Sequence, residues 1–457
     1  MRLLRQEGWH RKQCILRLVG ALCVVAVSLD GAWSQDRAPS TAEDILSLDQ
    51  AVHIALQNNP RLKAAMARVG QAEARLGAAK AARGFHLNLQ STAIRSGPEV
   101  SFSLAPFGAG EVVVSPTFRY IHSLQLQKNV YDGGRRSAQQ SIAAIGREVA
   151  QRGLQQTRDD ITLEVKVAYF EVLRARRLRE VGQETLKAAE EHLRVTKARF
   201  QAGVTAKFDV LRSEAEVEDA RQRLIDDEAL VAFAEAQFNT VLGRPLMTPV
   251  NIASVEDMPV MTVTLEKALE TAHTHRPELL ALQQQVDIAQ QQIRLARAGW
   301  KPNLDVVSNY DRTRATAFQR STAYALTAVL TVPLFDSGLA RAQVAEAQKS
   351  LKEAEQHVES VRQRVELEVK QAYLNLSRAR QRRVTAEKQL AAAAESLRVS
   401  EVRYNAGVGT NVEVTDARVA WTRARWNQVN ALYDYLVALA QLEHAMGTTV
   451  AALASTG

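Results

Sequence analysis

The sequence RFQAGVTAKFDVL at residues 199–211 returns as RYNAGVGTNVEVT at residues 403–415. The two stretches share an arginine, a glycine and an acidic residue in the same places: Arg199 and Arg403, Gly203 and Gly407, Asp209 and Glu413. Each stretch interrupts a long helical pattern with an Ala-Gly-Val step, and glycine adopts positive φ without steric cost. Both stretches are therefore predicted to be the tips of long helical hairpins, and the function is expected to depend on them.

The repeat extends far beyond the tips. At an offset of 204 residues, the correspondence runs without a gap from YDGG at 131–134, matching FDSG at 335–338, to LG at 242–243, matching MG at 446–447. Upstream, LDQA at 48–51 matches LEKA at 265–268. An ungapped correspondence of this length indicates duplication. We expect a first structural repeat over residues 35–250 and a second over residues 251–457.

Each repeat is expected to carry the same elements in the same order. The first has helices at about 48–58 and 60–83, strands within about 85–130, a long helix at about 134–202 and a return helix at about 206–242. The strands of the second repeat are expected within about 303–334. The Gly- and Pro-rich segment 96–116 is predicted to be an exposed loop between strands. The chain is thus predicted to be mainly α with a small β part.

The predicted strands alternate apolar and polar residues. The apolar positions are Phe118, Tyr120, Leu124 and Leu126 in the first repeat and Tyr324, Leu326, Leu330 and Val332 in the second. A period of two over about ten residues suits a membrane-barrel strand, and it suits an ordinary hairpin on a core equally well. Two strands per repeat give four per chain, fewer than the about eight of the smallest membrane barrels. A membrane role would therefore require an oligomer.

The long helices carry heptads with apolar residues at alternating steps of three and four. One run is Leu186, Ala189, Leu193, Thr196 and Phe200, repeated as Leu390, Ala393, Leu397, Ser400 and Tyr404; another is Ile161, Val165, Ala168 and Val172, repeated as Val365, Val369, Ala372 and Leu376. Such seams pack helices side by side as coiled coils. A helix of about 68 residues would be on the order of 100 Å long.

Residues 1–34 are predicted to be a secretory signal peptide, with a basic start, an apolar run at 18–29 and small residues before a cleavage site; a retained N-terminal anchor is the alternative. Both cysteines, Cys14 and Cys23, lie in it, so the mature chain would have no thiol. Leu22 stands where a lipobox needs a small residue, so no lipid anchor is expected. No later run approaches the ~20 apolar residues of a membrane helix, so membrane entry would require a closed β-barrel.

These motifs in this order resemble the TolC-like outer membrane efflux protein family over residues 45–450. The resemblance implies a homotrimer with an α-helical barrel in the periplasm and a 12-stranded transmembrane β-barrel in the lipid of the outer membrane. It implies a passive exit duct for a tripartite efflux pump or a type I secretion system, supplied by an inner-membrane transporter and a periplasmic adaptor (membrane fusion protein). Small-molecule and protein cargo stay equally open. A periplasmic coiled-coil scaffold or adaptor without a barrel is the alternative.

The resemblance also assigns roles at the tips. Glu413 and Asp416 match acidic residues that ring the entrance, where three copies would place six carboxylates. Asp209 and Tyr404 match residues that bridge the closed mouth, but Gly409 stands where the basic partner is expected. The tip residues matched to adaptor docking are Arg199, Gly203, Val204, Arg403, Gly407 and Val408. Without the resemblance, the acids would be solvated surface residues and the glycines ordinary helix-turn chemistry.

The sequence offers nothing for an enzyme. It has no phosphate-binding Gly-rich Lys motif, no HExxH and no Gly-x-Ser-x-Gly elbow. His273 and His275 are too few ligands for a metal site. The net charge of +8 falls to +5 when five basic and two acidic residues leave with the signal peptide, which does not favour nucleic acid. No cofactor, metal or nucleic acid is expected.

Overall fold

The computed structural model describes residues 45–98, 100–103, 111–115, 117–254, 263–314 and 320–448, so the signal peptide predicted at 1–34 lies outside the described residues. The helices are α2 (Leu48–Asn58), α3 (Pro60–Ala81), α4 (Arg135–Gln201), α5 (Lys207–Leu242), α6 (Leu265–His275), α7 (Pro277–Arg297), η2 (Ala298–Trp300), α8 (Leu339–Asn405) and α9 (Asn411–Met446). The strands are β1 (His86–Arg95), β2 (Val100–Ser103), β3 (Glu111–Ser115), β4 (Phe118–Tyr131), β5 (Asn303–Arg314) and β6 (Arg320–Thr331). The predicted mainly helical fold with a small sheet is confirmed.

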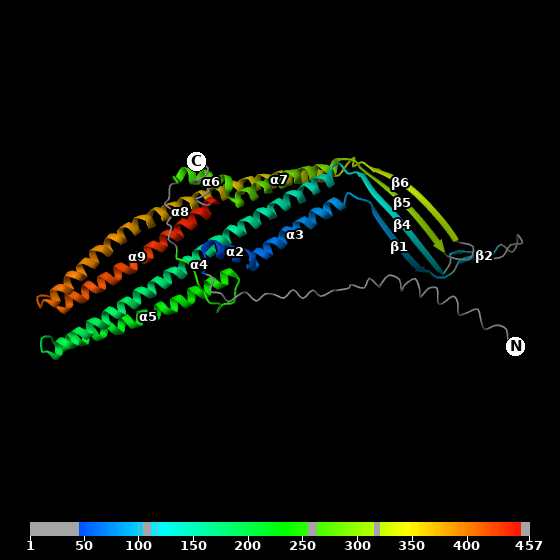
Figure 1. The fold of residues 1–457 in the computed structure, drawn as a ribbon. Helices are drawn as coiled ribbons and strands as arrows, with labels where there is room; N and C mark the ends of the chain where they lie inside the picture. Colours follow the sequence, from blue (N-terminus) through cyan, green and yellow to red (C-terminus); the bar gives the residue numbers. More distant parts are fainter. Residues whose placement is uncertain are drawn as a thin grey trace, which may run out of the picture. The chain divides into compact units, whose positions relative to one another are not determined.

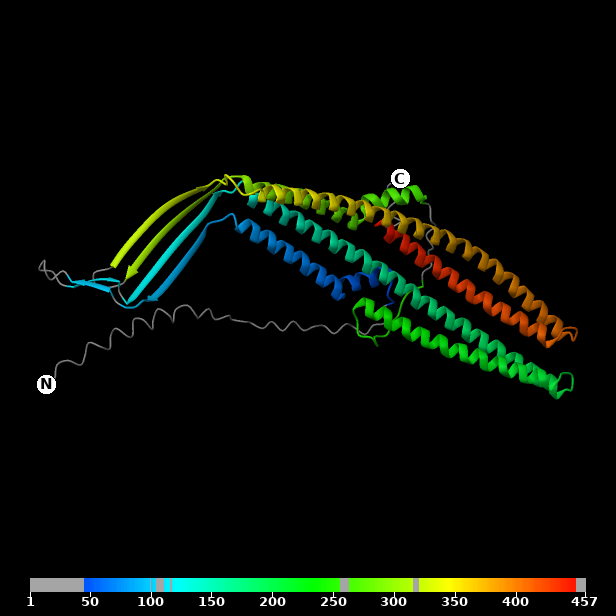
Figure 2. The same cartoon turned by 180° about the vertical axis from the view of Figure 1, so that it is seen from behind.

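Four long helices form two hairpins, α4 with α5 and α8 with α9 (Figure 1). The helices α4 and α8 have 67 residues each, and α5 and α9 have 36 each. At ~1.5 Å per residue, α4 and α8 are each about 100 Å long. Seen from behind, α3 and α5 follow one another along α4, and α7 and α9 along α8 (Figure 2). The two shorter helices of each hairpin unit therefore lie end to end along its 67-residue helix.

Each 67-residue helix begins directly after a strand, at a matched cap. Gly134 and Gly338 have positive φ, 93° and 86°, and turn the chain into α4 and α8. Asp132 accepts a hydrogen bond from the N–H of Gly134 at 3.0 Å, and Asp336 accepts one from the N–H of Gly338 at 3.0 Å. The aspartate and the glycine together fix where each long helix starts.

The main sheet is antiparallel, with strand order β1-β4-β5-β6 (Figure 1). The segment 96–116, predicted to be a loop, instead contains the hairpin β2–β3, which forms a separate two-stranded sheet. That prediction was wrong because its glycines and prolines hid the strand preference of its valines. Residues 99, 104–110 and 116 of the segment lie outside the described residues.

The register of the main sheet puts apolar side chains on one face. One row across the sheet runs from Leu87 of β1 to Leu126 of β4, then to Ser308 of β5 and Leu326 of β6. On the same face, Leu89 pairs with Leu124 in the next row. Tyr324 and Leu326 are 88% and 76% exposed. The opposite face carries polar residues such as Asn88, Gln125 and Asn309, which are also in register. A single chain therefore exposes a continuous apolar surface, which an ordinary core-packed hairpin would bury.

The buried core lies at mid-length of the long helices. All four residues of the predicted seam Ile161, Val165, Ala168 and Val172 are buried there, with the ends of α9 and α5 packed on them. Toward the tips, the buried hydrophobic cluster is small, with Ala189, Val217 and Ala220, and several of the other buried residues there are polar, such as Thr196 and Ser213. The predicted seam near the tips is only partly buried, since Phe200 is exposed. Of the helices in the described ranges, none has both the length and the apolarity needed to span a bilayer.

Candidate functional site

The two tips are helix reversals of the same construction. Gly203 and Gly407 have positive φ, 73° and 78°. The N–H of Val204 donates to the carbonyl of Arg199 at 3.0 Å, and the N–H of Val408 donates to that of Arg403 at 3.1 Å. These bonds close the last helical turns and leave both valine side chains exposed. The predicted hairpin tips are confirmed, and their role in docking stays a prediction.

Arg199 joins the first tip to the second. Its Nη1 donates to the carbonyl of Tyr404 at 2.9 Å and its Nη2 to that of Asn405 at 3.3 Å. Its guanidinium carbon lies 4.2 Å from the centroid of the Tyr404 ring. A cation is stabilised both at the C-terminal end of a helix and over an aromatic face. Arg199 therefore holds the end of α8, a contact that sequence reasoning did not anticipate.

A polar relay that is buried at His192 and Asn411 runs between α4, α9 and α5. Asn411 donates from Nδ2 to Asp209 at 3.4 Å, so its Oδ1 accepts from Nε2 of His192, at 2.7 Å. The other carboxylate oxygen of Asp209 accepts from Thr205 at 2.7 Å. Burial, assisted by the charge of Arg418, lowers the pKa of His192, so this imidazole is neutral.

The predicted bridging residues Asp209 and Tyr404 lie at the two ends of this relay. The rings of Tyr404 and His192 are 5.8 Å apart, and the Tyr404 hydroxyl is buried without a hydrogen-bond partner among the described residues. A Cβ added at Gly409 would lie 2.9 Å from the backbone nitrogen of Tyr404. The turn therefore has no room for the basic side chain expected at position 409. His192 was not predicted, because a single polar residue in a helix seam gives no sign in the sequence that its side chain forms a buried hydrogen bond.

Each predicted entrance acid faces an arginine of the same chain. Glu413 lies 3.5 Å from Nε of Arg403, and Asp416 lies 3.5 Å from Nη2 of Arg212. Glu413 is in the first turn of α9, where Thr410 accepts from its N–H at 3.2 Å. The Asp416 side chain is 70% exposed, so its open side can meet another group. Both acids therefore lie near the second tip, each beside an arginine, and their role at an entrance stays a prediction.

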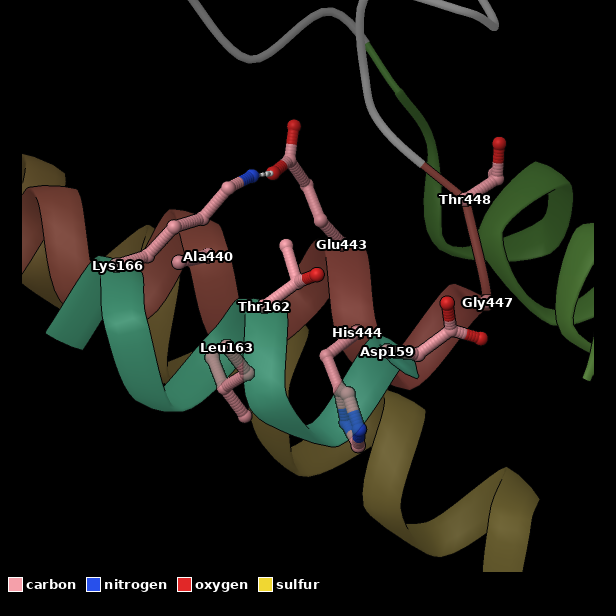
Figure 3. A pocket seen from close by; sticks show the side chains of 9 residues that line it. All are labelled: Asp159, Thr162, Leu163, Lys166, Ala440, Glu443, His444, Gly447 and Thr448. Carbon is pink, nitrogen blue, oxygen red and sulfur yellow. Dashed lines mark hydrogen bonds and ion pairs between the residues drawn. The ribbon is translucent and has the colours of Figure 1, made fainter. Parts of the chain in front are cut away.

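A pocket of about 90 Å³ lies between α4 and the C-terminal end of α9 (Figure 3). Lys166 reaches from α4 to Glu443 of α9, with Nζ and Oε2 2.6 Å apart (Figure 3). Next to it, Nε2 of His444 lies 2.8 Å from Asp160. These two polar contacts join the two repeats at mid-length. Within the described ranges, no group of three acidic, histidine or cysteine side chains could hold a metal ion.

Comparison with known proteins gives a consistent result. The family described as "Outer membrane efflux protein" matches residues 51–244 and 268–448. Protein CyaE of Bordetella pertussis is 27% identical over 399 residues, covering 86% of this chain and 82% of that protein. Outer membrane protein TolC of Escherichia coli is 27% identical over 350 residues, covering 71% and 69%. The crystal structure of a membrane protein from Pseudomonas aeruginosa has the same fold, with a TM-score of 0.77 at 21% identity over 89% of this chain and 91% of that one.

Proposed function

The chain belongs to the outer membrane efflux protein family and is an outer membrane exit duct, and we propose that it works as a homotrimer with a transmembrane β-barrel. As in the channels of this family, its work is passive export rather than catalysis. The helical hairpins are proposed to lie in the periplasm, after removal of residues 1–34 as a signal peptide.

The observation that carries this proposal is the open sheet with its exposed apolar face. Strands β1 and β6, of 10 and 12 residues, are its two edges. In lipid an open strand edge is costly, because backbone groups have no water to bond, so the sheet must close on other copies. Three copies would supply 12 strands, each about long enough to cross the hydrocarbon layer at a tilt. The apolar face would then meet lipid and the polar face the duct.

At the other end of α4 and α8, we propose that the tips receive the partners. A periplasmic adaptor (membrane fusion protein) would dock on the exposed Val204 and Val408, whose turns are set by Gly203 and Gly407. Arg403 would contribute from the tip surface. Arg199 would act indirectly, because its guanidinium is already bound to the end of α8. An inner-membrane transporter would deliver the cargo, either small molecules or proteins.

The membrane proposal is tested by two matched arginine substitutions in β6. Leu326→Arg places a charge on the apolar face, where it costs about 2–4 kcal/mol at mid-membrane, whereas Ala325→Arg points to the polar face. We expect the wild type and Ala325→Arg to fractionate with the outer membrane as trimers by native mass spectrometry, and Leu326→Arg to be lost from it. A soluble, monomeric wild-type protein would instead support a periplasmic scaffold.

We further propose that the acids at the tips set the ion preference of the entrance. Combining Glu413→Ala with Asp416→Ala removes two negative charges per chain near a narrow mouth, where charge focuses the potential. The expected result is a fall of roughly twofold or more in the cation-to-anion permeability ratio, read from reversal potentials in planar bilayers. Glu395→Ala, on the surface of α8 beside Arg398, is the control and should leave the ratio unchanged. An unchanged ratio in the double variant would reject the proposal.

A further inference from the structure

Side-chain pairs recur between the two repeats at the offset of 204. Arg194 lies 2.6 Å from Glu191 in α4, and Arg398 lies 2.6 Å from Glu395 in α8. These residues differ in number by 204. Equivalent positions in the two repeats therefore have equivalent neighbours along one helix.

The same holds between the helices of each hairpin, even where the charges are exchanged. Lys197 of α4 lies 2.8 Å from Glu214 of α5, and Glu401 of α8 lies 3.3 Å from Arg418 of α9. The base is on the long helix in the first hairpin and on the return helix in the second, but the two positions that form the pair are the same. Contacts in one hairpin thus predict which positions meet in the other.

One ion pair joins the two hairpins at equivalent positions. Arg212 in α5 and Asp416 in α9 also differ by 204 and lie 3.5 Å apart. Each is therefore the counterpart of the other. In a ring of three chains, every hairpin has one neighbouring hairpin in its own chain and one in the next. If equivalent positions meet at the boundary between the two hairpins of one chain, the same positions also meet at the boundary between hairpins of adjacent chains.

We propose that, in the trimer, Arg212 and Asp416 form a ring of six alternating charges. Each Asp416 pairs with Arg212 of its own chain on one side and with Arg212 of the neighbouring copy on the other. This inference rests on the proposed trimer. It uses the open side of Asp416, whose side chain is 70% exposed in the single chain.

The geometry makes this ring a lock for the closed entrance. Six evenly spaced points around an axis form a hexagon whose side equals its radius, so a contact between neighbours brings all six side chains close to the axis. Opening must break the contacts at both kinds of boundary. The ring supplies ion pairs that hold the entrance closed. A basic residue at position 409 cannot supply them, because the turn at Gly409 has no room for its side chain.

Charge reversal tests the lock. Arg212→Asp gives a ring of six acids and Asp416→Arg a ring of six bases, and like charges in contact repel. Each variant is expected to raise the conductance of the resting channel in planar bilayers severalfold. Carrying both substitutions together restores the alternation and the low conductance. Arg194→Asp, outside the ring, should conduct like the wild type. If the single variants have the conductance of the wild type, or if the combined variant keeps a high conductance, the proposed lock is wrong.

Cross-linking tests whether the ring passes between chains. In a background with Cys14→Ser and Cys23→Ser, Arg212→Cys and Asp416→Cys are joined with a short bis-maleimide and the product is heat-denatured. We expect covalent dimers and trimers, whereas Glu191→Cys with Arg194→Cys should give only monomers. Native mass spectrometry of the same sample before heating distinguishes a missing trimer from a trimer without the ring. A trimer without cross-linked chains would overturn the ring, and a monomer would overturn the proposed trimer itself.

Discussion

Replacing Asp227 by alanine is expected to stabilise the α4–α5 hairpin by about 3 kcal/mol at pH 8 and by almost nothing at pH 4. Asp227 is 2% exposed, and its Oδ2 has no hydrogen-bond partner among the described residues. Burial, with a contribution from the charge of Asp226, raises the pKa of Asp227 to about 6 from the ordinary value of 3.8. A rise of about two units corresponds to about 3 kcal/mol between the charged and neutral forms.

The sign of this effect follows from the raised pKa. The neutral carboxyl is favoured in the folded chain, so its contribution is fully present below pH 3.8 and is lost as the pH rises through 6. Above pH 6 the wild type must keep a buried, unpaired charge, which the variant lacks. The advantage of Asp227→Ala should therefore grow between pH 4 and pH 6. Thermal loss of the helical circular dichroism signal, measured in detergent at both pH values, checks it.

The second repeat supplies the matched design. Asp227 packs on Gly182, where an added Cβ would lie 2.8 Å from Oδ2, and the equivalent residues are Ala431 and Ala386. Gly182→Ala alone should destabilise the hairpin, but combined with Asp227→Ala it should be tolerated because it recreates the alanine pair. Asp227→Asn keeps the size and removes the titration. An Asp227→Ala advantage of the same size at pH 4 and pH 8 would contradict the buried-charge explanation.

The second large effect is expected at Arg276, before the first turn of α7. Its side chain is 7% exposed, and its Nη1 and Nη2 each donate to Glu368 of α8 at 2.7 Å. Removing one partner of a buried ion pair costs about 3–5 kcal/mol, because the other charge is left uncompensated. Because Glu368 is 47% exposed and water can solvate it, we expect about 2 kcal/mol for Arg276→Gln. The midpoint of thermal unfolding in detergent measures this loss.

The first repeat provides the control, because Glu164 is the counterpart of Glu368. Arg61 binds Glu164 at 2.6 Å, but both side chains are about half exposed, so Arg61→Gln should cost less than about 1 kcal/mol. Burial alone would raise the pKa of Glu368, but the hydrogen bonds and charge of Arg276 outweigh it, and the net pKa is lowered. The stabilisation is thus present above the ordinary pKa of 4.5 and is lost as the pH falls through the lowered value. Equal losses for both arginine variants would contradict this.

The sequence was sufficient for the features that depend on local chemistry. Glycine at both tips and Asp-Gly caps before the long helices set the helix ends, so these were predicted to within a few residues. Two of the four main strands, β4 and β6, followed from alternation. The hairpin β2–β3 was missed because Gly and Pro outweighed a short run of valines.

The candidate site was predictable only in part. Glu413 and Asp416 lie near the second tip, each beside an arginine, and their role at an entrance stays a prediction. The contact between Arg199 and the end of α8 depends on which helix of one hairpin lies beside the other, and the heptad pattern does not specify this. The absence of room at Gly409 depends on the backbone path of the turn, which motif matching does not describe.

The placement of the buried core has a mechanical consequence. The large hydrophobic cluster packs the helices at mid-length, whereas the cluster toward the tips is small and several buried residues there are polar, so each hairpin behaves as a cantilever with a stiff root and a more compliant free end. From Val181, at the last part of the large cluster, to Gly203 is 22 residues, a lever of roughly 33 Å. A tilt of about 5° at the root would displace the free end by about 3 Å, comparable to the reach of an ion pair. A small deflection at the root is therefore enough to part the charges at the mouth while the root stays packed.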